Sequence, residues 1–112
     1  MSTRISSRDD ITAVLASIKQ TTGVDWVYSH FKNGHSLPYI AYIGAGQHRF
    51  MASDSQYWRS DTYQVELYFR NKDPELEEAI EDAIIAGGWT FDKSDDAYLD
   101  DEGIYLVYYF LA

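Results

Sequence analysis

The chain has 112 residues, of which 46% are hydrophobic and 24% charged, so it is long enough to bury its own core and has the composition of a globular protein. It has no cysteine, which excludes disulfides, thiolate metal sites and cysteine nucleophiles. Its formal charge of -9 disfavours contact with nucleic acid or anionic lipid. We expect a single domain over residues 1–112, without an export signal or a membrane-spanning segment.

The first predicted element is an amphipathic helix over residues 8–21. Apolar residues recur there at the spacing i, i+3, i+4 and i+7, at Ile11, Val14, Leu15 and Ile18. Gly23 follows as a plausible end of the helix.

Two predicted strands follow, over residues 24–31 and 37–43. Both are rich in aliphatic and aromatic residues, and Asn33-Gly34 between them is typical of a tight turn, so we expect a hairpin. The glycines of residues 44–46 interrupt the second strand as a loop or bulge, and residues 47–51 are candidates for a further short strand.

Residues 53–60 are mostly polar, which predicts a loop. This loop would carry two large aromatic residues, Tyr57 and Trp58, and exposed rings of this kind are candidates for contact with another protein. Residues 62–70 then alternate between apolar and polar positions, which predicts a strand with one buried face.

A second helix is predicted to begin at Pro74, with Asp73 as its N-cap, and to end at Gly87-Gly88. Its acidic residues, including Glu77 and Glu81, are interpreted as its solvated side. A strand is predicted to begin at residues 89–91, followed by an acidic turn over residues 92–103 and a closing strand over residues 104–111. The connections are too short for repeated helical crossovers. We therefore predict an α+β fold, with a mainly antiparallel sheet of five to six strands and two amphipathic helices.

No motif for catalysis or for cofactor binding is present. Aligning the acidic turn with a calcium-binding loop puts Ala97 where a glycine is needed and Gly103 where the bidentate glutamate belongs. The three histidines have no spacing that predicts a metal site, and no carboxylate partner at a motif distance. We predict a protein that is not an enzyme and has no catalytic residues, metal, cofactor or small-molecule substrate.

The closing strand is apolar on both faces, and the chain is 16% aromatic with ten tyrosines. Aromatic residues are enriched in protein interfaces. One interpretation is a central strand under a curled sheet; the other is a subunit interface that includes Tyr105, Val107 and Tyr109. With Tyr57 and Trp58, these form the predicted protein-contact residues.

The segment from Tyr57 to Asp73, running into Glu78, combines a loop, a strand that ends in aromatic residues, a polar turn and a Glu-rich helix. The chain then closes with an acidic turn and the strand that runs to Phe110. In this pattern and in the order of its elements, the chain resembles the small tail proteins of long-tailed bacteriophages and prophages, in particular the tail-terminator, tail-completion and tail-to-head joining proteins.

This resemblance implies a structural protein of the virion, located at the tail or the head-tail junction and in the host cytoplasm before assembly. It also implies a homo-oligomeric ring, commonly of six subunits, which contacts other tail or head-connector proteins. The partners would be protein only, without nucleic acid or membrane.

The alternative function is an acidic protein-binding or inhibitory module of a phage or bacterium, which includes the possibility of a DNA mimic. The charge of -9 and the Glu-rich second helix favour this alternative.

Overall fold

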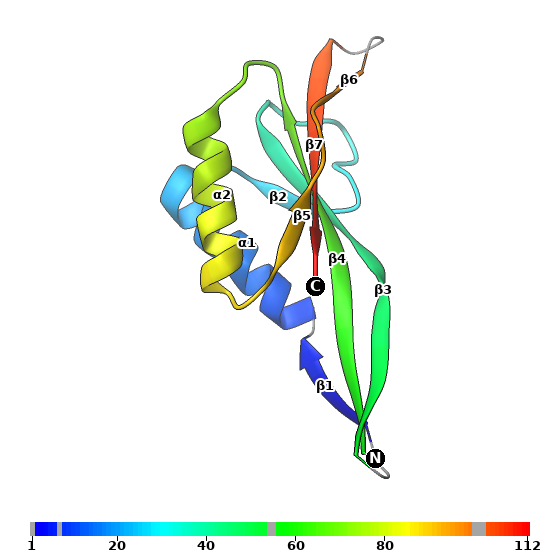
Figure 1. Ribbon diagram of the computed structural model, residues 1–112. Helices are drawn as coiled ribbons and strands as arrows, with labels where there is room; N and C mark the ends of the chain where they lie inside the picture. The colour runs from blue at the N-terminus through cyan, green and yellow to red at the C-terminus, as the bar shows by residue number, and fades with distance from the viewer. Residues whose placement is uncertain (1, 7, 54–55, 100–102) are drawn as a thin grey trace.

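The fold is a sheet of seven strands with two helices (Figure 1). The computed structural model describes residues 2–6, 8–53, 56–99 and 103–112, with the backbone alone for residues 2–6, 8, 48–53 and 56–60. In chain order the elements are β1 (Ser2–Ser6), α1 (Arg8–Thr22), β2 (Trp26–Tyr28), β3 (Tyr39–Ser53), β4 (Gln56–Phe69), α2 (Pro74–Ala86), β5 (Phe91–Lys93), β6 (Ala97–Leu99) and β7 (Ile104–Leu111).

The long strands β3, β4 and β7 form the middle of the sheet, in the order β2-β3-β4-β7-β5. β6 also pairs with β7, and β1 pairs with β4. The pairs β3–β4, β4–β7, β5–β7 and β6–β7 are antiparallel, whereas β1–β4 and β2–β3 are parallel. The predicted α+β class and mainly antiparallel sheet are confirmed. β1 and β6 are strands that the sequence did not predict, and β6 lies within the segment that was predicted as an acidic turn.

Both helices begin and end close to the predicted residues, because local signals fix their ends. Asp73 caps α2: its carboxylate accepts a hydrogen bond from the Leu76 backbone N–H at 3.1 Å. Gly87 ends the helix, and Gly88 has a φ of +87°, which a residue with a side chain rarely adopts. At the end of α1, Gly23 donates its N–H to the Lys19 carbonyl at 2.8 Å.

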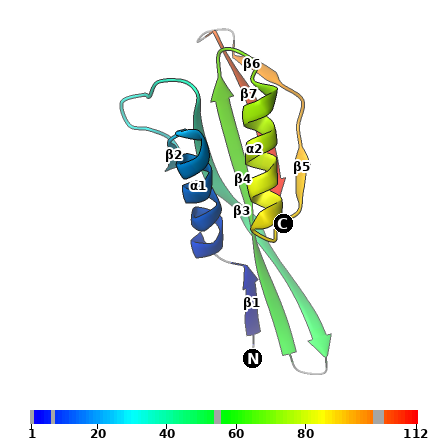
Figure 2. The ribbon, with the colours of Figure 1, turned by 90° about the vertical axis from the view of Figure 1, so that its left-hand side faces the viewer.

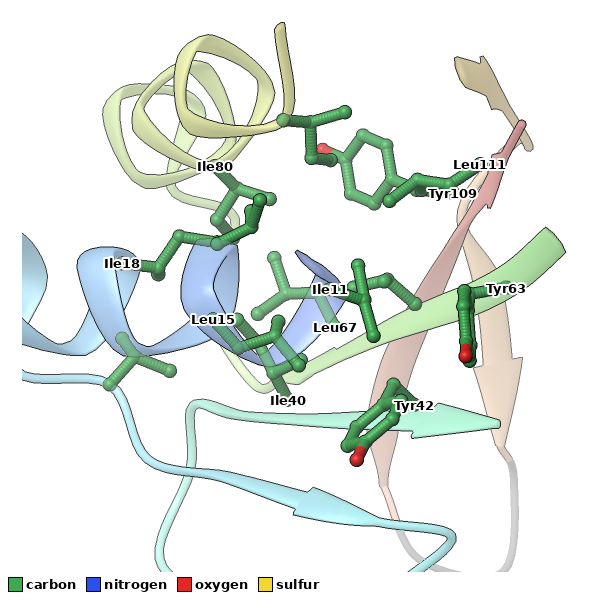
Figure 3. Packing of buried hydrophobic residues seen from close by; sticks show 14 of the residues in the cluster. Ile11, Leu15, Ile18, Ile40, Tyr42, Tyr63, Leu67, Ile80, Tyr109 and Leu111 are labelled. Carbon is green, nitrogen blue, oxygen red and sulfur yellow. The ribbon is translucent and has the colours of Figure 1, made fainter. Parts of the chain in front are cut away.

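The hydrophobic core lies between the two helices and one face of the sheet, called here the helix face (Figure 3). α1 contributes Ile11, Leu15 and Ile18, and α2 contributes Ile80 and Ile84, all with at most 1% of their surface exposed. The apolar alternation predicted for residues 62–70 is confirmed, since its apolar members belong to this core: Tyr63, Val65, Leu67 and Phe69. The same sheet face includes residues of β3 and β7.

The predicted hairpin over residues 24–43 is wrong, because β2 and β3 run parallel. The connection between them, residues 29–38, brings the chain back to the level at which β2 begins. β3 therefore runs in the same direction as β2, and Trp26 lies opposite Ile40. Backbone bonds secure both ends of the pair: Ile40 donates to the Asp25 carbonyl and Ser29 to the Tyr42 carbonyl, each at 2.9 Å. Gly34 does lie in a turn, with a φ of +77°, but within a longer loop.

The predicted loop over residues 53–60 is also wrong. β3 continues to Ser53 and β4 begins at Gln56, so most of this segment is strand. A bulge between Gly44 and Gly46 lets β3 run through the glycines as one strand. Beyond the bulge, β3 and β4 pair with each other, and β1 joins β4 on its other side. This three-stranded unit, residues 2–6, 46–53 and 56–61, is called the arm.

The arm extends past the ends of both helices (Figures 1 and 2). It accounts for the elongated shape of the molecule, whose principal extents are 52 × 28 × 26 Å.

Candidate interaction surface

β7 divides its residues between two environments, as the alternation of a strand requires. Val107 and Tyr109 are completely buried in the core beneath the helices. Their assignment to a protein interface is therefore corrected: they belong to the helix face, which the two helices already cover. Tyr105 is 39% exposed near the end of the same strand face, where its ring stacks on Phe69 with 5.6 Å between ring centroids.

Tyr57 and Trp58, the other two predicted contact residues, lie in the arm. Their backbones belong to β4, opposite Met51 and Phe50 of β3 and opposite Ser2 and Thr3 of β1. Their side chains are outside the described part of the structure. The structure thus separates the predicted contact residues into an arm pair, a buried pair and the exposed Tyr105.

The opposite side of the sheet, called here the open face, has neither helix over it (Figure 1). It is built from three residues of each long strand: Tyr39, Ala41 and Ile43 of β3; Gln64, Glu66 and Tyr68 of β4; and Leu106, Tyr108 and Phe110 of β7. Phe110 is 45% exposed, a large value for an apolar ring. Phe31 and His35 of the loop after β2 pack against Tyr39 of this face.

Glu66 lies at the centre of the open face, with Ala41 directly opposite on β3 and Tyr108 directly opposite on β7. Only 9% of Glu66 is exposed. Its two carboxylate oxygens each accept one hydrogen bond, from the Gln64 amide and the Tyr68 hydroxyl, both at 2.7 Å. A charged side chain is therefore held in a fixed position among aromatic neighbours.

The carboxylate of Glu66 helps to raise the pKa values of Tyr68 and Tyr108, the two tyrosines next to it. Burial raises the pKa of Tyr68, and the hydrogen bond to Glu66 raises it further, because an ionised phenol would face a negative charge. Burial also raises the pKa of Tyr108, with a second contribution from the charge of Glu66. Both hydroxyls consequently remain neutral donors or acceptors at neutral pH.

Stacked aromatic pairs stand on two sides of Glu66. Tyr39 and Tyr68 stack with their centroids 4.8 Å apart and an angle of 18° between ring planes. Tyr108 and Phe110 form the second pair, at 6.2 Å and 17°. Aromatic rings fixed in this way present a large contact area that loses little conformational entropy on binding.

His35 has a carboxylate partner that its spacing in the sequence did not predict. Its Nε2 lies 2.9 Å from an Asp25 carboxylate oxygen, and its Nδ1 lies 2.8 Å from the Ser36 carbonyl. Asp25 also forms an ion pair with Lys19, and hydrogen bonds from Lys19 and then His35 lower the pKa of Asp25. Since both ring nitrogens are engaged, the contact fastens the loop after β2 to the body of the protein.

Glu77 was predicted to lie on the solvated side of α2. This prediction is wrong, because only 3% of Glu77 is exposed. Two lysines form ion pairs with it, Lys72 of the turn before α2 and Lys93 of β5, each at 2.8 Å. The hydrogen bond with Glu77 raises the pKa of Lys72. Burial acts against the charge of Lys93, but hydrogen bonds with Glu77 and Glu81 outweigh it and raise the pKa of Lys93.

This network fixes the acidic segment after α2. Lys72 also pairs with Asp96 at 2.9 Å, and Lys93 pairs with Glu81 at 3.0 Å. Glu81 in turn accepts a hydrogen bond from the buried hydroxyl of Tyr109 at 2.9 Å. Each charged member has a partner of opposite sign, so the network stabilises the fold.

In the part of the chain that the structure describes, no three His, Asp or Glu side chains come together as a metal site. Neither helix is long and apolar enough to cross a bilayer. The sequence matches no protein-family model, and the search of curated proteins finds none that is similar to it.

Proposed function

We propose that this chain is a structural protein of a bacteriophage virion, at the tail or the head-tail junction, where it acts as a tail-terminator, tail-completion or minor tail protein. It would assemble into a homo-oligomeric ring and contact other tail or head-connector proteins. The observation that carries the proposal is the open face, where Phe110 is exposed and Tyr39, Tyr68 and Tyr108 are partly exposed without a helix over them.

Three features support a role in protein contacts. The open face takes residues from three strands, and all but Ala41, Glu66 and Leu106 of its nine residues are at least partly exposed. The arm extends from the body and leaves the outer edges of β1 and β3 available for pairing with another chain. The resemblance of residues 57–78 and 101–110 to small phage tail proteins supplies the biological setting.

The direct test is to delete the gene from the phage that encodes it and to examine the particles by electron microscopy. We expect free heads, or tails of uncontrolled length, and restoration of normal virions when the wild-type gene is supplied in trans. Normal virions from the deletion strain would contradict the proposal.

The acidic face of α2 supports the second candidate function, an acidic binding or inhibitory module. Glu75, Glu78 and Asp82 are all exposed on α2, whereas Glu77 and Glu81 are engaged by lysines. A pull-down from host lysate separates the two functions. Recovery of one basic host protein, weakened by salt, would support the second, and recovery of tail components would support the first.

A further inference from the structure

Two adjoining clefts lie at the end of the sheet where β4 turns into α2. The smaller cleft, of about 290 Å³, lies between the loop after β2 and the start of α2. The larger cleft, of about 580 Å³, lies between the same loop and the start of β7. Leu37, Arg70 and Asn71 line both clefts, so the two spaces meet at these residues. Clefts of roughly 300–1,000 Å³ are typical of ligand sites.

Arg70 is a positive charge of these clefts that lacks an acidic partner. Lys72, which also lines the smaller cleft, forms ion pairs with Glu77 and Asp96. The side chain of Arg70 forms neither an ion pair nor a hydrogen bond in the part of the chain that the structure describes. In a chain of formal charge -9, a guanidinium without a carboxylate is available to an anion from outside.

The larger cleft suits an anion. None of the described residues that line it is Asp or Glu, and its polar lining includes Arg70, Asn71 and Ser36. His35 lines it as well, but both of its ring nitrogens are already engaged. The Arg70 guanidinium and the Asn71 amide are therefore the groups that can donate hydrogen bonds to an anion there.

The smaller cleft offers an apolar wall. Leu67, Phe69 and Leu76 line it, and each is at most 9% exposed, so core side chains form this wall. Asp73 also lines the smaller cleft, and its carboxylate caps α2 by accepting the Leu76 N–H. The negative charge of Asp73 repels an anion from the smaller cleft and leaves that space to an uncharged group.

We infer that the two clefts form one binding site for a carboxylate that is joined to an aliphatic or aromatic group. Arg70 binds the carboxylate in the larger cleft through two parallel hydrogen bonds, and the apolar group packs in the smaller cleft against Leu76. A carboxylate fits better than a phosphate, whose charge exceeds what one guanidinium balances. The site goes beyond the proposed function. The sequence did not predict it, because Leu37 meets Arg70 only in the folded chain.

The probe that tests this site is N-acetyl-leucine, with two matched controls. N-acetyl-leucinamide lacks the charge, and acetate lacks the apolar group. Saturation-transfer difference NMR detects binding on the signals of the probe, so it applies to the full chain in any state of assembly. We expect saturable binding of N-acetyl-leucine with a Kd of roughly 1 mM, and at least roughly tenfold weaker binding of each control.

Variants of exposed residues locate the site without disturbing the core. Arg70→Gln should weaken binding of N-acetyl-leucine at least roughly tenfold, while its circular dichroism spectrum should match that of the wild type. Arg70→Lys keeps the charge but not the paired hydrogen bonds, and should retain part of the affinity. Lys32→Gln makes the same change of net charge at an exposed position that lines neither cleft, and should bind as the wild type does.

A second probe separates two sources of such a carboxylate. The peptide N-acetyl-Gly-Gly-Gly-Leu presents the same end group as the carboxyl terminus of a polypeptide. Binding tighter than that of N-acetyl-leucine would identify a peptide terminus as the ligand, whereas equal or weaker binding would identify a free organic acid.

The inference is overturned if N-acetyl-leucine shows no binding at about 10 mM, ten times the expected Kd. It is equally overturned if the acid and its amide bind alike, if Arg70→Gln binds the acid as the wild type does, or if Lys32→Gln loses binding to the same extent. The proposed function is judged separately, by whether the protein is found in virions.

Discussion

The two faces of the same three strands have opposite characters. On the helix face, Val65, Leu67 and Val107 are at most 1% exposed and pack against α1 and α2. On the open face, the positions between them hold a carboxylate, an amide and half-exposed aromatic rings, with neither helix as cover. The difference separates two tasks: the helix face makes the fold stable, and we propose that the open face provides a surface for contact.

The largest expected difference between the faces is in the cost of truncation. Leu67→Ala leaves a cavity in the core, so we expect it to lower the free energy of unfolding by about 2–5 kcal/mol. Phe110→Ala removes a larger side chain that is 45% exposed, and should cost no more than about 1 kcal/mol. Urea denaturation measures both. Equal losses would show that the open face stabilises the monomer as much as the core does.

A smaller effect is expected from the ion-pair network in which Glu77 of α2 contacts Lys72 and Lys93. Glu77→Gln removes the negative charge that two lysines share, and should lower the free energy of unfolding by about 1–3 kcal/mol. Both lysines are partly exposed, so water compensates part of the loss. The matched control is Glu78→Gln, one position along the helix and exposed, which should change the stability by less than about 0.5 kcal/mol. The contrast would fail if the two variants were equally stable.

High pH should weaken the helix face through Tyr109. Burial, followed by the hydrogen bond to Glu81, raises the pKa of Tyr109 in the folded protein above the ordinary value of 10.0. Its contribution is therefore complete below that pH. Above it, the unfolded chain releases the phenolic proton and the folded protein keeps it. The free energy of unfolding should consequently fall by about 1.4 kcal/mol per pH unit on account of this residue.

Tyr109→Phe isolates this effect. At neutral pH the variant loses only the hydrogen bond to Glu81, at a cost of about 1 kcal/mol. As the pH rises above 10.0, the gap between the two proteins should close and then reverse, which urea denaturation at pH 7, 10 and 11 would detect. A constant gap would mean that Tyr109 does not titrate differently in the two states.

Local patterns in the sequence predicted those parts of the fold that local chemistry determines. Asp73 and Pro74 fixed the start of α2, and the apolar run after Gly103 fixed β7. Pairing between distant segments was harder to predict. Asn33-Gly34 favoured a hairpin, but the contacts of His35 and Asp25 hold a loop that makes β2 parallel to β3.

The contact surface was predicted less well than the fold, for a physical reason. The sequence showed that β7 is apolar on both faces, but not which face the helices cover, so the buried residues Val107 and Tyr109 were assigned to the interface. Glu66 was recognised as a polar position of its strand. Its burial depends on tyrosines of β4 and β7 that come together only when the sheet forms.

The most direct test of the central claim, that the open face is a contact surface between copies, is the molar mass of the wild-type protein. Size-exclusion chromatography with light scattering would measure it over a wide range of concentration. We predict a discrete species that contains two or more copies of the chain. A mass equal to one chain at every concentration would contradict the claim.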